Sequence, residues 1–193
     1  GSVLMSGLHS LNDPDHGFVG DYNLIWFNND GSLDVTKTHR VGNGIIEYIA
    51  AQPDGKFLLS GSCTMWEGQP VGNTFRVMPD GSLDTTFTAA MAWGEVVSFT
   101  VLPDGKILAP GLFKTTAASP DSLHMVRLMP DGSFDPTFHN SLEVIQTAWA
   151  DPPMTWGQFI IPEHQVLSDG RILLYSVHMI VDGQARWSCH VGC

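Results

Sequence analysis

Short apolar runs separated by Asp-Gly turns dominate the pattern of hydrophobic and polar residues along the chain. A typical run, residues 96–102, precedes Pro103-Asp104-Gly105, and a second run, residues 106–109, follows that turn. Residues 124–129 alternate enough between apolar and polar to be read as a strand. Because Pro presets φ, Asp bonds the backbone ahead of it and Gly accepts positive φ, these segments predict hairpin turns. The pattern therefore predicts an all-β fold of short strands.

Two turn motifs recur along the chain with a common period. The first, with Lys or Arg after the Gly, has its Asp at positions 54, 104 and 169, and the second, with Ser after the Gly, has its Asp at positions 30, 80 and 131. Within the two series, three of the four steps from one Asp to the next are 50 or 51 residues. A period near 50 is typical of stacked or radial repeats. Two hairpins give each repeat four strands, so the sequence predicts a β-propeller-like array of four-stranded antiparallel blades.

About three and a half such repeats are present, in a single domain of residues 1–193. The repeat units span approximately residues 3–53, 57–103, 107–168 and, in part, 172–193. The spacing of oxygen ligands before each Gly does not match a calcium-binding loop, so the turn aspartates are predicted to be structural. The residues assigned to these structural turns are Asp54, Gly55, Asp80, Gly81, Asp104, Gly105, Asp131, Gly132, Asp169 and Gly170.

The two motifs resemble the delta-60 repeat family, a set of bacterial β-propeller-like repeats. The resemblance is specific at residues 53–59, 79–87, 103–109 and 130–138, where both turns and a trailing Phe are present. The sequence departs from the family pattern at residues 28–36, where Asn29 replaces Pro, and at the last turn, where Ser168 replaces Pro. The resemblance implies a propeller-type repeat, favours a secreted or cell-surface location, and carries no established catalytic residues.

Charge and hydropathy narrow the classes of partner. Nine Lys plus Arg against 20 Asp plus Glu leave a formal charge of −11, which would repel a phosphate backbone, so no nucleic-acid partner is predicted. No run approaches the roughly 18 to 20 apolar residues of a membrane helix, so no membrane span is predicted. The three cysteines, Cys63, Cys189 and Cys193, are too few for a disulfide framework.

The third repeat contains 14 more residues than the others between its second motif and the next turn. Insertions into regular repeats often carry recognition, and Trp faces stack on sugars or other flat ligands. The alternative is a cap over an exposed propeller edge, for which Pro and charged residues are suited. The candidate ligand-binding residues of this insertion, residues 147–164, are Trp149, Asp151, Trp156, Glu163 and His164.

The connections between the two hairpins of each repeat form a second candidate surface. They span residues 8–21, 62–72, 112–122 and 175–184, and equivalent loops of successive blades emerge on the same face. His9, His16 and His178 in the first and last connections are weak candidates for a metal site, because their spacing is not that of a compact metal motif. The alternative is a set of solvated loops.

Function is less constrained than architecture. The sequence contains no nucleophile elbow, phosphate loop or dinucleotide fingerprint, and no cofactor is predicted. The first hypothesis is a non-catalytic repeat protein that binds a ligand or protein partner through its loops and the insertion. The alternative is a hydrolase or lyase of propeller fold with a His/carboxylate site. Unpaired first and last strands also predict a homodimer through these edges.

Overall fold

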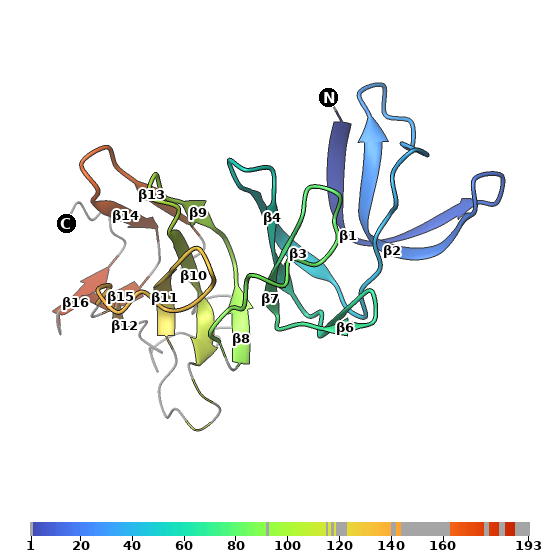
Figure 1. Cartoon of the computed structure of the whole chain (residues 1–193). Helices are drawn as coiled ribbons and strands as arrows, with labels where there is room; N and C mark the ends of the chain where they lie inside the picture. The colour runs from blue at the N-terminus through green and yellow to red at the C-terminus, as the bar shows by residue number, and fades with distance from the viewer. Residues whose placement is uncertain are drawn as a thin grey trace. The chain divides into compact units, whose positions relative to one another are not determined.

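The computed structural model describes residues 2–91, 93–114, 116, 118, 123–139, 142–143, 163–175, 178–181 and 184–187. These residues form strands and turns without a helix, which confirms the all-β class (Figure 1). Within them, no helical segment is of the length and hydropathy needed to cross a bilayer. Residue contacts divide the chain into two compact units, Gly1–Ala89 and Ala90–Cys193, which we describe separately.

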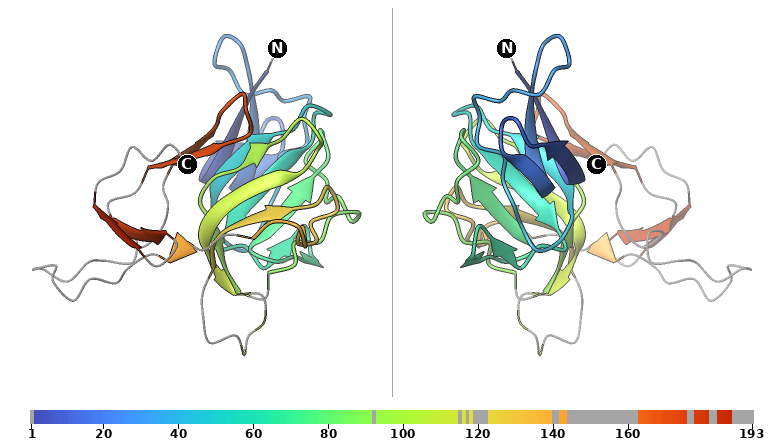
Figure 2. Two further views of the ribbon diagram at one scale, coloured as in Figure 1. Left: turned by 90° about the vertical axis from the view of Figure 1, so that its left-hand side faces the viewer. Right: turned by 90° about the vertical axis from the view of Figure 1, so that its right-hand side faces the viewer.

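The N-terminal unit opens with a long antiparallel hairpin of β1 (Ser2–Asp13) and β2 (Phe18–Asn28), drawn in blue in Figures 1 and 2. Its ladder runs from the pair Ser2 and Asn28 to the pair Asp13 and Phe18, with a bulge between Ser6 and His9. The predicted connection at residues 8–21 is therefore mostly strand, because cross-strand pairs continue almost to the turn. That turn is closed by a hydrogen bond from the Gly17 N–H to the Pro14 carbonyl, at 3.2 Å.

The second sheet of this unit has the order β3 (Ile46–Ala51), β4 (Phe57–Gly61) and β7 (Thr74–Val77). The fourth strand expected in this blade is reduced to one bridge between Val77 and Leu83. The strand ends there because the next residue, Asp84, begins a turn in which its carbonyl accepts the Phe87 N–H at 3.2 Å.

A small hairpin of β5 (Met65–Trp66) and β6 (Gln69–Pro70) lies in the connection between β4 and β7. Glu67 and Gly68 join its strands with φ of 47° and 80°, which is the backbone of a tight type I′ turn. The predicted connection at residues 62–72 is thus an ordered hairpin.

The core of the N-terminal unit lies between these two sheets. Leu24 and Trp26 of β2 meet Leu59 of β4 and Phe75 of β7, all buried. Cys63 and Trp66 of the connection are also in this cluster and have no exposed surface. Neither of these two side chains is therefore available on the loop surface.

In the C-terminal unit, β10 (Ile107–Lys114) pairs on one side with β11 (Leu123–Leu128) and on the other with β8 (Trp93–Val96) and β9 (Thr100–Val101). The strands β8 and β9 together take the place of β3, and a single bridge between Leu128 and Phe134 stands where the last strand of the blade is expected. This sheet repeats the arrangement of β3, β4 and β7 in the preceding repeat.

The last repeat departs from this arrangement. Here β13 (Glu163–Val166) and β14 (Ile172–Tyr175) form a two-stranded hairpin, and β16 (Gln184–Trp187) pairs with β15 (His178–Val181), which pairs with β12 (Leu142–Glu143). The predicted connection at residues 175–184 therefore contains a strand. Val181 pairs with Gln184 across the two residues Asp-Gly, a sequence that favours a tight hairpin between these strands.

The turn motifs have the backbone that their sequences predict. Gly81, Gly105 and Gly132 have φ of 82°, 82° and 91°, which confirms the expected left-handed conformation. At the first kind of turn, the Lys106 N–H donates to Asp104 Oδ1 at 3.1 Å. At the second kind, the Ser82 N–H donates to Asp80 Oδ1 at 2.9 Å. The aspartate side chains at these turns thus bond the backbone two residues ahead.

Replacing Gly105 by Ala is expected to lower the free energy of unfolding by about 1 kcal/mol, because a Cβ is unfavourable at positive φ. A Cβ at Gly105 would meet just one atom, Pro130 Cγ at 3.5 Å, so backbone strain accounts for the loss. Gly72 provides the matched control: its φ lies outside the positive range and its Cβ position is free of contacts closer than 3.6 Å. Urea unfolding should show no loss for Gly72→Ala, and equal losses would contradict the turn assignment.

Candidate functional site

A buried aspartate joins the two hairpins of the second repeat. Asp84 is 4% exposed, and its Oδ2 accepts hydrogen bonds from Arg76 Nε at 2.8 Å and pairs with Lys56 Nζ at 2.9 Å. Its Oδ1 accepts the Thr86 hydroxyl at 2.6 Å and the Thr86 N–H at 3.0 Å. We call this group of Lys56, Arg76, Asp84 and Thr86 the aspartate hub.

The third repeat contains the same hub. Asp135 Oδ2 lies 2.9 Å from Lys106 Nζ and accepts Arg127 Nε at 2.7 Å, while Oδ1 accepts the Thr137 hydroxyl at 2.7 Å. In both repeats the arginine also covers an aromatic ring: Arg76 lies 4.8 Å from the centre of the Phe87 ring, and Arg127 lies 4.9 Å from that of Phe138. The hub is thus a repeated unit of charge, hydroxyl and aromatic contacts.

Electrostatics keep both hub aspartates ionised. Burial opposes the charge of Asp84, but hydrogen bonds from Thr86, Lys56 and Arg76 outweigh it and hold the pKa of Asp84 well below its usual range. For Asp135, the Thr137 side chain is the largest cause of a lowered pKa, followed by the Thr137 N–H and Lys106. A carboxylate stabilised in this way is a poor proton acceptor at neutral pH, so the hub is suited to hold structure.

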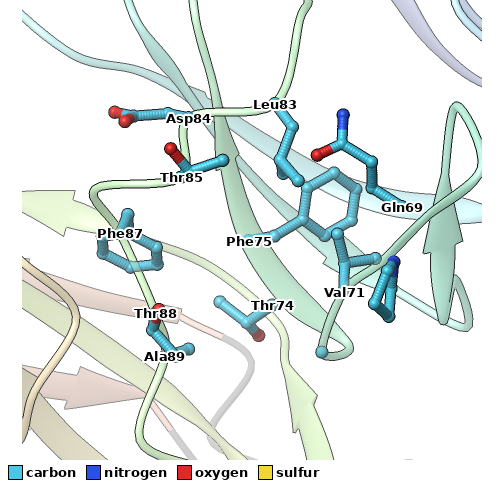
Figure 3. A pocket seen from close by; sticks show the side chains of 12 residues that line it. Gln69, Val71, Thr74, Phe75, Leu83, Asp84, Thr85, Phe87, Thr88 and Ala89 are labelled. Atoms are coloured by element: carbon cyan, nitrogen blue, oxygen red, sulfur yellow. The ribbon is translucent and has the colours of Figure 1, made fainter.

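A cavity of about 350 Å³ adjoins the hub of the second repeat (Figure 3). Phe75 and Phe87 contribute buried aromatic rings, and Val71 adds a half-buried side chain from the connection. Polar groups lie between them: Thr85, Thr88 and Gln69 are exposed, and Thr74 is buried with its hydroxyl 3.2 Å from that of Ser60. The cavity lining consists of Gln69, Pro70, Val71, Gly72, Thr74, Phe75, Leu83, Asp84, Thr85, Phe87, Thr88 and Ala89.

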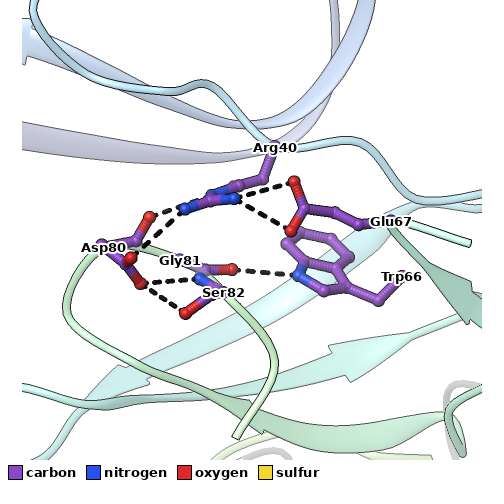
Figure 4. A network of polar contacts seen from close by, with 6 residues as sticks. All are labelled: Arg40, Trp66, Glu67, Asp80, Gly81 and Ser82. Atoms are coloured by element: carbon purple, nitrogen blue, oxygen red, sulfur yellow. Dashed lines mark hydrogen bonds and ion pairs between the residues drawn. The ribbon is translucent and has the colours of Figure 1, made fainter. Parts of the chain in front are cut away.

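The hairpin that forms one wall of this cavity is anchored to the second turn (Figure 4). Arg40 binds both carboxylate oxygens of Glu67 at 2.9 Å and donates from Nε to the Asp80 carbonyl at 3.0 Å. Trp66 Nε1 donates to the Gly81 carbonyl, also at 3.0 Å. These contacts anchor the β5–β6 hairpin at Glu67 and at Trp66. This wall of the cavity is therefore held in place by the protein itself.

The first repeat replaces the hub arginine with an aromatic cluster. Trp26 stands where Arg76 stands one repeat later, and it stacks on His39 with ring centres 6.3 Å apart. Phe18 and Tyr22 contact the same imidazole edge-on, at 4.5 and 5.9 Å. His39 Nδ1 accepts the Trp26 N–H at 3.3 Å, and in the described part of the chain its buried Nε2 has no hydrogen-bond partner.

Most of the insertion lies outside the described residues. This holds for Trp149, Asp151 and Trp156, so their predicted ligand-binding role stays a prediction. Glu163 and His164 begin β13, and His164 Nδ1 lies 3.3 Å from the Ser98 hydroxyl. Burial lowers the pKa of His164. The structure thus places one member of the predicted set, His164, beside Ser98 in the segment between β8 and β9.

The structure describes the positions of the three weak metal-site candidates, His9, His16 and His178. His9 Nε2 lies 2.9 Å from the Ser6 carbonyl, and His16 Nδ1 lies 2.9 Å from Asp13 Oδ2. His178 begins β15 in the other compact unit. Within the residues that the structure describes, no group of three or more His, Cys, Asp or Glu side chains is arranged to hold a metal ion.

Sequence reasoning did not identify the hubs, although their signal was present. Lys56 and Lys106 follow the first turns, Arg76 and Arg127 precede the second, and Asp84 and Asp135 end the second motif at matching positions. Both aspartates lie in the segments 79–87 and 130–138 that carry the family resemblance, but the turn motifs alone do not connect them to their two cationic partners. An Asp, Lys and Arg that keep one spacing over successive repeats are the pattern to search for.

Comparison with known proteins supports the repeat architecture. A family model described as "Domain of unknown function (DUF5122) beta-propeller" matches residues 52–87 and 102–138. No curated protein matches the sequence. Each matched segment contains one complete aspartate hub, from its Lys to its Phe. The chain therefore carries two segments similar to a β-propeller domain, as its turn motifs predicted.

Replacing Asp84 by Asn is expected to lower the free energy of unfolding by roughly 3 kcal/mol, since Arg76 and Lys56 would lose their counter-charge in a buried setting. Asp80→Asn is the matched control, because Asn keeps the oxygen that caps the turn and the Asp80 side chain is 68% exposed. Its loss should stay below about 1 kcal/mol. Urea unfolding compares the two variants, and similar losses would show that the hub does not stabilise the fold.

Acid should destabilise the fold through His39. Burial is the main cause of the lowered pKa of His39, and the charge of Asp34 opposes it in part. The unfolded chain then takes up this proton first, so stability is complete above about pH 7 and falls as the pH drops below about 6.5. His39→Asn keeps an acceptor for the Trp26 N–H and should flatten the change in urea midpoint between pH 7.5 and 5. The exposed His139→Asn variant should retain the wild-type slope, and an unchanged slope in His39→Asn would refute this assignment.

Proposed function

We propose that the chain is a non-catalytic, β-propeller-like array of delta-60-type repeats that binds a ligand or protein partner. Binding occurs through the loops between hairpins and through the insertion at residues 147–164, and each repeat of about 50 residues serves as one blade. The observation that carries this proposal is the cavity between the connection at residues 62–72 and the strand β7.

The charges around the cavity support binding rather than acid–base chemistry. Asp84 is the one carboxylate of the lining, and its oxygens already accept bonds from Thr86 and face Arg76 and Lys56. The remaining lining is uncharged. A neutral ligand with one apolar face and several hydroxyl or amide groups fits such a surface, because the rings of Phe75 and Phe87 contact its face and Thr and Gln side chains bond its edge.

Saturation-transfer NMR with phenyl β-D-glucopyranoside tests this proposal, since the probe has both an aromatic face and hydroxyl groups. Val71→Arg places a long charged side chain in the cavity and should abolish the transfer to the probe. Val41→Arg is the matched control, because Val41 is 45% exposed and lies outside the lining. Equal transfer in both variants would remove the cavity as the binding site, and the absence of transfer in the wild type would exclude this class of probe.

The same samples test the hydrolase alternative. Hydrolysis of the glucoside would release phenol, which is measured by its absorbance at alkaline pH. We expect no release above the buffer rate. Release that is lost in His164→Gln would favour the alternative of a propeller-type hydrolase with a His/carboxylate site.

A further inference from the structure

A second cavity lies in the C-terminal unit, between two turns of the first kind. Its volume is about 630 Å³, which is in the size range of small-molecule sites. One wall is residues 100–104, and the other is residues 166–168 with Gly170, which are equivalent by sequence to residues 101–103 with Gly105. We call it the turn cavity. It shares no residue with the cavity of the second repeat.

Both walls of the turn cavity are attached to one sheet. On one side, β9 (Thr100–Val101) is paired with β10. On the other side, Val166 of β13 packs against Leu108 of β10 and Met125 of β11, which are buried. The protein itself therefore positions the two walls, and a site formed in advance costs less to order when a ligand binds.

Most of the lining is apolar. Val101 and Leu102 come from the first turn, and Val166 and Leu167 come from the second. All four side chains are half-buried, so each keeps some surface that a ligand can cover. Arg127 of the third-repeat hub is the one cation of the lining. The surface therefore favours a ligand that has both an apolar part and an acceptor for a guanidinium.

Arg127 has donors that the hub does not use. Its Nε donates to Asp135 Oδ2 at 2.7 Å and its Nη2 donates to Thr137 Oγ1 at 3.2 Å. Within the part of the chain that the structure describes, Nη1 has no hydrogen-bond acceptor, and the side chain is 25% exposed. A guanidinium carries five N–H donors, so Arg127 can serve the hub and a ligand together.

The one carboxylate of the lining, Asp104, does not neutralise Arg127. Its Oδ1 accepts the Lys106 N–H at 3.1 Å, and its Oδ2 lies 3.8 Å from Lys106 Nζ. The side chain of Asp104 is 57% exposed, so water screens its charge. The positive group of the turn cavity is thus left for an acceptor from outside the hub.

We propose that the turn cavity binds a small organic carboxylate with an apolar body. The carboxylate accepts from Arg127 Nη1, and the apolar body lies between the Val and Leu side chains of the two turns. Charge-assisted hydrogen bonds to a guanidinium are stronger than those between neutral groups, which favours the ionised acid over a neutral ligand of the same shape. This site goes beyond the proposed function, whose cavity suits a neutral ligand.

Three probes of one shape test the charge preference on the full chain: phenylpropionate, phenylpropanamide and phenylpropylamine. In amide NMR spectra, the acid should shift the signals of Val101, Leu102 and Leu167 with a dissociation constant on the order of 1 mM. The neutral amide should bind at least about fivefold more weakly, and the amine more weakly still. Equal binding of acid and amide, tighter binding of the amine, or no shift with the acid would overturn the proposal.

A pair of variants at Ser168 locates the site without changing the hub. Ser168 is exposed and belongs to the lining. Ser168→Glu places a competing carboxylate in the turn cavity and should weaken binding of phenylpropionate at least about fivefold, whereas Ser168→Gln, of matched size, should change it less than about twofold. Equal effects of the two variants would overturn the assignment of the carboxylate to Arg127.

Val71→Arg separates this site from the cavity of the second repeat. Val71 lines that cavity and lies outside the turn cavity, so the variant should bind phenylpropionate as the wild type does. Loss of phenylpropionate binding in Val71→Arg would assign the acid to the second-repeat cavity and overturn the proposal.

Discussion

The buried carboxylate of the aspartate hub is the contact on which the rest of each complete repeat depends. Lys56 comes from the first hairpin, Arg76 from β7 and Asp84 from the segment after the second turn, so one side chain joins three parts of the chain. The same contact positions the Arg76 guanidinium over Phe87, whose ring forms part of the cavity lining. Packing, the end of the sheet and the shape of the cavity therefore depend on a single ionised group, because a buried charge is tolerated only where its partners hold fixed positions.

The first repeat shows that the same backbone can be supported without the cations. Trp26 and His39 fill the space beside Asp34 with stacked rings. Phe18 and Tyr22 of β2 contact the His39 imidazole from its edges. Aromatic contacts bury more apolar surface than an ion pair does, and they require no charged partner. The N-terminal unit thus stabilises one repeat by buried ion pairs and the neighbouring repeat by aromatic contacts. The aromatic cluster also places a titratable group, His39, in the core.

The parts of this fold that depend on local chemistry could be predicted, and those that depend on distant partners could not. The turns at Gly81 and Gly105 follow from three or four adjacent residues, and their φ values agree with the prediction. The fourth strand was overpredicted, because the carboxylate of Asp84 bonds Arg76 and Thr86 and draws the chain into a turn after Leu83. The candidate site divides in the same way: the connection at residues 62–72 was identified, but its cavity depends on Phe75 and Phe87 from outside it.

Every partner of a hub aspartate lies within one continuous segment of the chain, residues 56–87 in one case and residues 106–138 in the next. A copy of such a segment placed in tandem brings its own counter-charges and leaves those of its neighbours satisfied. Arg171 stands at the position of Lys56 and Lys106 in the third turn of the first kind but does not bind a hub aspartate. It pairs with Asp169 of its own turn instead. Gene duplication can therefore lengthen or shorten such an array by whole repeats without creating an uncompensated buried charge.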